Sequence, residues 1–310
     1  MKLVVTIPAY NEEKTLGKVI SEIPKKIKGI SKIEVLVIND GSIDKTVQVA
    51  RKAGAVILTN KSNMGLARTF KKGLEKALEM GADIIVNTDA DLQYNQKQIP
   101  ALIKPILDSK ADIVLGSRFK GWIESMPFQK KLGNKIATWA VRQVSGIPVS
   151  DAQTGFRAFT REATAKMNIQ SQHTYTQETI IQAAFKGLTI KEIPIDFRKR
   201  ADNSRLISNI FSYGKRAALT VFTGYLNYKP LKVFGAIGVI FFLGGLAAGL
   251  RVLFHYLSTG VVTPFLPTAI LSAVLIIFGF QIIVIGLLAD MTKNNRRLQE
   301  EILYMEKIRK

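Results

Sequence analysis

Short apolar runs alternate with amphipathic stretches over the first 118 residues of the chain. Between the runs, stretches such as GLARTFKKGLEKALEMG repeat apolar residues at helical spacing. Regular alternation of strands and helices is typical of an α/β fold with parallel strands. The pattern therefore predicts a doubly wound, mostly parallel sheet, with strands at residues 3–7, 34–38, 55–58, 83–86 and 112–115.

The alternation loosens between residues 119 and 195. The segments GWIESMPFQKKLGNKIATWAVRQV, SDAQTGFRAFT and TYTQETIIQAAFKG precede a last strand-like segment, TIKEIPIDF. We interpret this region as the second half of the same domain, which would then cover residues 1–198.

Two long apolar runs, at residues 233–257 and 266–289, dominate the last third of the chain. Each reaches the length of about 20 apolar residues that crosses a hydrocarbon core of about 30 Å. The segment between them carries no charge and both outer flanks are basic. The positive-inside rule therefore places the N-terminal domain and a basic tail at 291–310 on the cytoplasmic side of two transmembrane helices within 233–290. Glycines in GAIG and GGLAAG permit close helix packing, within one chain or in an oligomer.

The segment at 199–232 is basic, and its apolar residues alternate with basic ones. This pattern predicts an amphipathic helical segment in the membrane interface, with basic residues toward the lipid headgroups. Trp122 and Trp139 also fit a membrane-facing rim, although core packing is the better interpretation of Trp139.

The formal net charge of +20 favours an anionic partner, such as nucleic acid, anionic lipid or a phosphorylated substrate. The basic residues crowd beside the apolar runs, and no nucleic-acid recognition motif is present, so membrane lipid is preferred over nucleic acid. The absence of cysteine excludes disulfides, a thiolate nucleophile and cysteine-based metal sites.

Polar clusters follow four of the predicted strands directly: PAYNEE, NDGS, TDADLQ and GSRF. Ligands of parallel sheets bind beyond the carboxyl ends of the strands. Asp89 and Asp91 lie two residues apart on one side of an extended segment, and Gln93 continues the same row. Such a row of oxygen donors can hold a hard divalent cation on a diphosphate, whereas the plainer interpretation is an acidic strand end that pairs with lysine.

The segments IPAYNEE, NDGSIDKT, NMGLARTFKKG, TDADLQ and GSRF, in this order and spacing, resemble the family 2 glycosyltransferases of the GT-A fold, most closely the dolichyl- or polyprenyl-phosphate sugar synthases. The resemblance covers about residues 1–205. It implies that Asp89, Asp91 and Gln93 hold Mg²⁺ or Mn²⁺ and that Asp89, Asp91 and Arg118 are catalytic. It also implies a pocket for a nucleotide sugar formed by Pro8, Tyr10, Glu12, Ile38, Asp40, Asp89, Ala90 and Asp91.

The implied activity is that of a membrane-anchored, inverting hexosyltransferase. The donor would be UDP-glucose, UDP-N-acetylglucosamine or GDP-mannose, and the acceptor dolichyl or polyprenyl phosphate. Residues 119–195 would then bind the acceptor, and its phosphate would be held by Arg118, Lys130, Arg200 and Arg205. Glu178 is a candidate for a general base or for a residue that orients the sugar, with a helix-surface glutamate paired to lysine as the alternative.

Two departures from the family pattern affect the choice of sugar. Asn39 stands where many relatives have the first of two aspartates, and PFQKK replaces a segment in which mannose-transferring synthases commonly have arginine. TYTQETII resembles glucose- or N-acetylglucosamine-type members, which favours a UDP donor. Two alternatives remain open: a transferase with a saccharide acceptor, although the Q-x-x-R-W motif of processive synthases is missing, and a non-catalytic membrane-bound nucleotide-binding module.

Overall fold

The computed structural model describes residues 1–171, 174–199, 226 and 229–309 of the chain. They fall into an α/β unit and a helical unit formed by the C-terminal apolar segments. The strands are β1 (Lys2–Ala9), β2 (Lys32–Asn39), β3 (Val56–Thr59), β4 (Ile84–Asn87), β5 (Ile113–Ser117), β6 (Arg157–Thr160) and β7 (Ile190–Pro194). The helices of the α/β unit are α1 (Leu16–Glu22), α2 (Thr46–Lys52), α3 (Leu66–Glu79), the 3₁₀ helix η1 (Gln96–Gln98), α4 (Ile99–Leu107), α5 (Phe128–Ser145), α6 (Arg161–Lys166) and α7 (Thr176–Phe185).

The seven strands form one sheet in the order β3-β2-β1-β4-β6-β5-β7. Only β6 runs antiparallel to its neighbours β4 and β5, so the prediction of a mostly parallel sheet is confirmed. Strand β6 was not predicted from the sequence; it is four residues long and begins with an arginine that pairs opposite Asn87 of β4. Because the remaining strands are parallel, their carboxyl ends lie at one edge of the sheet.

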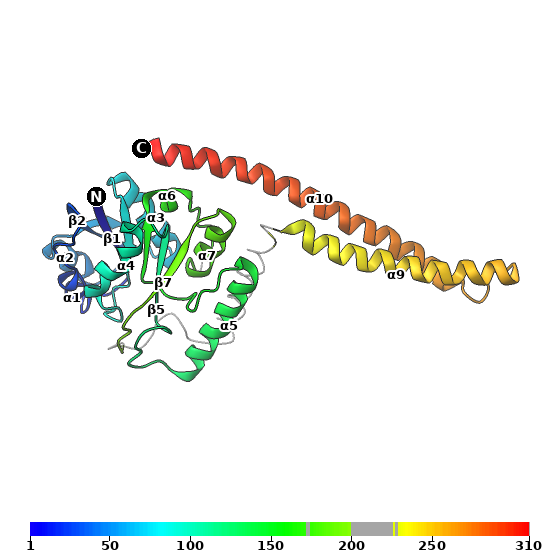
Figure 1. Cartoon of the computed structure of the whole chain (residues 1–310), viewed down its shortest axis with the longest axis horizontal. Helices are drawn as coiled ribbons and strands as arrows, with labels where there is room; N and C mark the ends of the chain where they lie inside the picture. Colours follow the sequence, from blue (N-terminus) through cyan, green and yellow to red (C-terminus); the bar gives the residue numbers. More distant parts are fainter. Residues whose placement is uncertain (172–173, 200–225, 227–228, 310) are drawn as a thin grey trace. The chain divides into compact units, whose positions relative to one another are not determined.

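Both faces of the sheet are covered, as a doubly wound fold requires (Figure 1). Alternate residues of β1, such as Leu3 and Val5, join a core with Leu16 of α1 and Leu102 of α4. On the opposite face α3 packs across β1 and β2. A Cβ atom on Gly73 of α3 would stand 2.8 Å from Cδ1 of Ile38, so the helix backbone lies close against β2.

The helical unit contains α9 (Pro230–Thr259) and the part of α10 (Leu266–Arg309) that runs to residue 300. Both helices are long and apolar enough to cross a membrane (Figure 1). The two helices pack closely through glycines. A Cβ atom on Gly245 would stand 2.9 Å from the carbonyl oxygen of Ser272, and one on Gly279 would stand 2.6 Å from the amide nitrogen of Phe242. Gly245 belongs to the GGLAAG segment, so the close packing predicted for that segment occurs within one chain. The predicted interfacial segment at 199–232 lies almost entirely outside the described residues.

The core position predicted for Trp139 is wrong. The buried face of α5 consists of Ala137, Thr138, Val141 and Val144. Trp139 lies on the opposite side of the helix and is 61% exposed.

Candidate functional site

A cavity of about 210 Å³ lies at the carboxyl ends of β1, β2 and β4. It is lined by Pro8, Ala9, Tyr10, Glu12, Asp40, Asn63, Gly65, Leu66, Thr69, Asp89, Ala90 and Asp91. All residues that the sequence assigned to a nucleotide-sugar pocket are in this set except Ile38, which is fully buried against α3. Three of the four polar strand ends thus meet at one cavity.

The loops after β1 and β2 are fixed to each other by hydrogen bonds. The backbone amide of Asn11 donates to Oγ of Ser42 (2.9 Å), and the amide of Ile43 donates to Oδ1 of Asn11 (2.9 Å). The amide of Glu12 donates to Oγ1 of Thr46 at the start of α2 (2.9 Å). These contacts hold one wall of the cavity, because each loop supplies the polar partners of the other.

Asp40 anchors the loop before α3. Its Oδ1 accepts hydrogen bonds from Nδ2 of Asn60 (2.8 Å) and from the amide of Met64 (2.9 Å), and its Oδ2 accepts one from the amide of Gly65 (3.0 Å). Gly65 has a φ of +87°, a conformation that favours glycine, and it caps the start of α3.

Four residues of this loop and helix start line the cavity and had no role predicted from the sequence. They are Asn63, Gly65, Leu66 and Thr69. The glycine directly before a strongly amphipathic helix was the signal that could have pointed to them.

Asp89 and Asp91 both face the cavity, immediately after β4. Gly155 packs directly against Asp89, since a Cβ atom at that glycine would stand 2.9 Å from Oδ1 and 3.0 Å from Oδ2. Asp91 accepts a hydrogen bond from the amide of Gln93 through Oδ1 (3.1 Å). The Gln93 side chain reaches toward the carbonyl of Arg198 (3.5 Å), and Gln93 is not among the residues that line the cavity.

The pair of carboxylates fits a hard divalent cation. Within the described residues no group of three or more His, Cys, Asp or Glu side chains is gathered that could enclose a metal by itself. Mg²⁺ commonly takes one or two carboxylates and completes its coordination with phosphate oxygens and water. Asp89 and Asp91 supply this kind of incomplete set at an open cavity.

A buried polar network holds Gly155, the residue that packs against Asp89. Nδ2 of Asn87 donates to the carbonyl of Gly155 and to the hydroxyl of Tyr175 (both 2.9 Å), and the amide of Gly155 donates to the hydroxyl of Tyr94 (2.8 Å). Burial raises the pKa of both tyrosines, and the charge of Asp89 raises it further. Both phenols therefore stay neutral. The hydroxyl of Tyr94 accepts from the Gly155 amide, whereas the hydroxyl of Tyr175 accepts from Asn87, which in turn donates to the Gly155 carbonyl.

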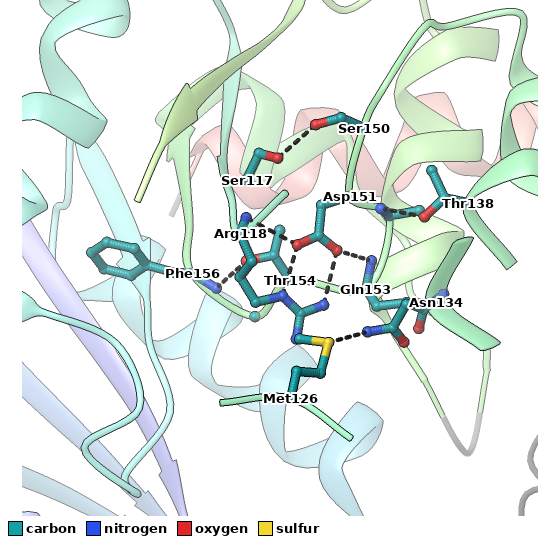
Figure 2. Close-up of polar contacts among 12 residues, drawn as sticks. Ser117, Arg118, Met126, Asn134, Thr138, Ser150, Asp151, Gln153, Thr154 and Phe156 are labelled. Carbon is teal, nitrogen blue, oxygen red and sulfur yellow. Dashed lines mark hydrogen bonds and ion pairs between the residues drawn. The ribbon is translucent and has the colours of Figure 1, made fainter. Parts of the chain in front are cut away.

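Arg118 follows β5 and forms a buried ion pair with Asp151 (Figure 2). Its Nε donates to Oδ2 (2.7 Å), its Nη2 donates to Oδ1 (2.8 Å), and its guanidinium lies 5.1 Å from the ring centroid of Phe197. Burial alone would raise the pKa of Asp151, but the charge and hydrogen bonds of Arg118 lower it overall. Arg118 is not among the residues that line the cavity, and the structure places its charge against this carboxylate.

Of the other three predicted phosphate ligands, the structure describes one. Lys130 lies in the first turn of α5, and Arg200 and Arg205 lie outside the described residues. Glu178 of α7 accepts hydrogen bonds from the amides of Gln170 and Ser171 (both 2.9 Å). It therefore fixes the segment before α7, an arrangement that none of its three predicted roles described.

Arg157, at the start of β6, is a further buried residue that the sequence analysis did not single out. Its guanidinium donates to the carbonyls of Ala152 (3.0 Å), Thr154 (2.8 Å) and Thr176 (2.7 Å). Burial lowers its pKa to about 10, so the side chain remains charged at neutral pH. It joins the loop that carries Asp151 and Gly155 to the start of α7.

Comparisons with known proteins agree with this geometry. The chain is 30% identical over 211 residues to the UDP-N-acetylglucosamine–dolichyl-phosphate N-acetylglucosaminyltransferase of Methanococcus voltae. The match covers 61% of this chain and 82% of that protein. It is 32% identical over 206 residues to the dolichyl-phosphate hexose transferase of Haloferax volcanii, with 66% and 86% covered.

Among solved structures, the glucosyl-3-phosphoglycerate synthase of Mycobacterium tuberculosis in complex with Mn²⁺, UDP and glucosyl-3-phosphoglycerate superposes with a TM-score of 0.55 at 22% identity. The match covers 73% of this chain and 78% of that one, and it supports the fold. The model of glycosyl transferase family 2 matches residues 4–167, which contain the whole cavity and its carboxylate pair. The chain therefore belongs to glycosyl transferase family 2.

Proposed function

We propose that this protein is a membrane-anchored, inverting hexosyltransferase that moves a sugar from a nucleotide diphosphate donor to dolichyl or polyprenyl phosphate. The observation that carries the proposal is the meeting of Asp89 and Asp91 with the loops after β1 and β2 at one cavity, in a chain with two apolar helices long enough to span a membrane. The relatives named for dolichyl-phosphate substrates support the choice of acceptor.

Asp89 and Asp91 would hold Mg²⁺ or Mn²⁺ on the donor diphosphate. When bound, the cation would neutralise charge that develops on the leaving nucleoside diphosphate. Gly155 and the network of Asn87, Tyr94 and Tyr175 keep Asp89 in place, so little reorganisation is needed when the donor binds. The loop that Asp40 anchors forms the opposite wall, where we place the nucleoside.

The acceptor needs no general base. A phosphate monoester has a second pKa of about 6, so at neutral pH it is mostly a dianion. Its oxygen forms a bond to the anomeric carbon as the bond from that carbon to the donor diphosphate breaks. One such displacement inverts the anomeric configuration and converts an α-linked nucleotide sugar to a β-linked lipid phosphate sugar.

The residues proposed to hold the acceptor phosphate are Arg118, Lys130, Arg200 and Arg205. Because Asp151 occupies two nitrogens of Arg118, we assign Arg118 first to positioning the Asp151 loop beside the site. The catalytic domain, proposed to cover residues 1–198, and the C-terminal tail would lie on the cytoplasmic side, with a UDP-linked hexose or N-acetylhexosamine preferred over GDP-mannose.

Purified protein incubated with radiolabelled UDP- and GDP-sugars, Mn²⁺ and dolichyl phosphate tests the proposal. We expect one donor to give a labelled, organic-extractable lipid whose sugar is released by mild acid. Asp91→Ala should abolish transfer without changing the melting temperature by more than a few degrees. The proposal fails if no donor labels the lipid, and the metal assignment fails if Asp91→Ala is as active as the wild type.

The donor is distinguished by thermal shift. UDP-sugars with Mn²⁺ should raise the melting temperature more than GDP-sugars, and the difference should disappear without the metal. Transfer to a soluble saccharide in place of dolichyl phosphate would favour the alternative acceptor class. Binding of nucleotide without any transfer would favour a non-catalytic module.

A further inference from the structure

Helix α9 carries an arginine near the turn that joins it to α10 (Figure 1). Between Lys232 and Asp290 the chain has no acidic residue, and Arg251 and His255 are its only basic residues there. At about 1.5 Å per residue, Lys232 and Arg251 stand about 28 Å apart along α9. This distance is close to the thickness of a hydrocarbon core, which is about 30 Å. In a helix that spans the membrane, Arg251 therefore lies at the boundary of the core opposite to Lys232.

The guanidinium of Arg251 is held against an aromatic ring. Its Cζ lies 5.0 Å from the ring centroid of Phe265, the residue that precedes α10. The ring of His255, one turn further along α9, meets the same Phe265 ring in a T-shaped contact with the centroids 4.8 Å apart. Nε2 of His255 donates to the carbonyl oxygen of Thr263 (3.0 Å). These contacts fix the three side chains against the turn, so Arg251 is not a freely moving side chain on the helix surface.

The N–H donors of Arg251 are left for a ligand. Within the described part of the chain, its guanidinium has no hydrogen-bond acceptor and no carboxylate partner. A guanidinium that stacks on a ring keeps the edge of its planar fork free, and that edge matches two oxygens of a phosphate. An ionised side chain at the depth of the membrane is costly unless it is paired. The geometry of Arg251 therefore calls for an anion supplied from outside the chain.

We infer that Arg251 binds the phosphate group of a membrane lipid in the leaflet that surrounds the turn between α9 and α10. Lipid phosphates are the anions that a bilayer offers at the boundary of its hydrocarbon core. The site uses none of the residues proposed to bind the donor or the acceptor, and it would fix the depth of the two helices in the bilayer. The inference rests on the proposed function only in taking α9 and α10 to span a membrane.

A fluorophore at the turn tests the inference in the full chain. The sequence has no cysteine, so Val261→Cys gives a single position for a bimane label, and Val261 is 54% exposed. The labelled protein is reconstituted into phosphatidylcholine vesicles that contain a small fraction of nitroxide lipid, either phosphatidylglycerol or phosphatidylcholine, with the nitroxide near the headgroup. We expect phosphatidylglycerol to quench roughly two- to fivefold more strongly, because one basic residue at the surface enriches anionic lipid by about fivefold. Equal quenching by the two lipids would overturn the inference.

Arg251→Met in the labelled protein should make the two lipids quench equally. Methionine suits an apolar helix surface, and circular dichroism with gel filtration checks that the variant is folded. Arg51→Met is the matched control, because it removes the same charge from an exposed position in α2. It should keep the preference for phosphatidylglycerol. An Arg251→Met protein with the wild-type preference, or an equal loss in both variants, would overturn the inference.

Phe265→Leu separates the charge of Arg251 from its orientation. The variant keeps the guanidinium and removes the ring on which it stacks, so the preference for phosphatidylglycerol should fall below that of the wild type. An unchanged preference would overturn the role of the ring.

Competition identifies the source of the phosphate. Unlabelled phosphatidic acid and dolichyl phosphate are added separately at the same mole fraction, and the lipid that relieves the quenching at the lower fraction is the preferred ligand. Relief by neither lipid, or equal relief by inorganic phosphate at constant ionic strength, would overturn the assignment to a membrane lipid. None of these measurements requires sugar transfer, so their outcome is distinguishable from a failure of the proposed function.

Discussion

Gly155→Ala tests whether the position of Asp89 controls the reaction. The added Cβ atom would stand 2.9 Å from Oδ1 and 3.0 Å from Oδ2 of Asp89, whereas ordinary contacts begin at 3.4 Å. The carboxylate must therefore retreat by about 0.5 Å, or the β6 loop must shift by a similar amount. The backbone of Gly155 is not in the left-handed region, so alanine introduces no conformational strain of its own.

The expected loss follows from the contact of Gly155 with a carboxylate that we propose to hold the metal. Disturbing the residues that orient a metal ligand typically costs about 10- to 100-fold in affinity or activity, or about 1.4–2.8 kcal/mol. We expect kcat/KM to fall by this factor and the Mn²⁺ concentration for half-maximal activity to rise. The assay is transfer of labelled sugar to dolichyl phosphate over a Mn²⁺ titration, with the melting temperature measured in parallel.

Gly133→Ala is the matched control. A Cβ atom at Gly133 meets nothing within 4 Å, and alanine favours the helix there. It should leave kcat/KM and the Mn²⁺ dependence unchanged. Wild-type kinetics for Gly155→Ala would refute the reasoning, because Asp89 would then tolerate displacement. A large fall in melting temperature with unchanged activity would assign Gly155 to stability alone.

Three further predictions concern stability. Asp151→Asn leaves the buried guanidinium of Arg118 without its carboxylate and should lower the free energy of unfolding by about 3–5 kcal/mol in denaturant titrations at pH 7. The pKa of Asp151 in the folded state lies below its ordinary value of 3.8, so the stabilisation by this carboxylate is present above pH 3.8 and is lost as the pH falls through the folded pKa. The difference in unfolding free energy between the wild type and the variant should therefore narrow in acid. Asp108→Asn, which removes an exposed pair with Lys110, should cost no more than about 1 kcal/mol. Gly245→Ala should destabilise the helical unit in detergent by about 1–3 kcal/mol, because the added Cβ atom would meet the α10 backbone. Gly244→Ala is the control, since a Cβ atom there meets nothing within 4 Å. Equal melting temperatures of the two variants would contradict the packing described. Arg157→Met removes the guanidinium donor from three buried carbonyls and should lower the free energy of unfolding by roughly 3 kcal/mol in thermal or chemical unfolding. A loss under about 1 kcal/mol would show that water or neighbouring donors replace the guanidinium.

The chain alone determined the class of fold and the edge of the sheet that carries the site. Apolar runs and their spacing are local properties of the sequence. Polar residues that directly follow a strand lie at its carboxyl end, which is the ligand-binding edge of an α/β sheet. The two long apolar helices were predictable for the same reason, since their length and composition are contained in consecutive residues. Asp89 and Asp91 share the cavity because they are two residues apart after β4.

Contacts between distant segments were decided only by the tertiary structure. Gly155 lies against Asp89, and Asp151 pairs with Arg118, although each pair is far apart in the sequence. The short strand β6 forms because β4 and β5 offer hydrogen bonds on both of its sides. The four residues of β6, RAFT, have no local pattern that predicts a strand. The outward face of Trp139 likewise depends on which side of α5 meets the α/β unit. Local patterns specify elements and strand ends, whereas the partner of a buried charge and the exposed side of a helix depend on packing that no short segment encodes.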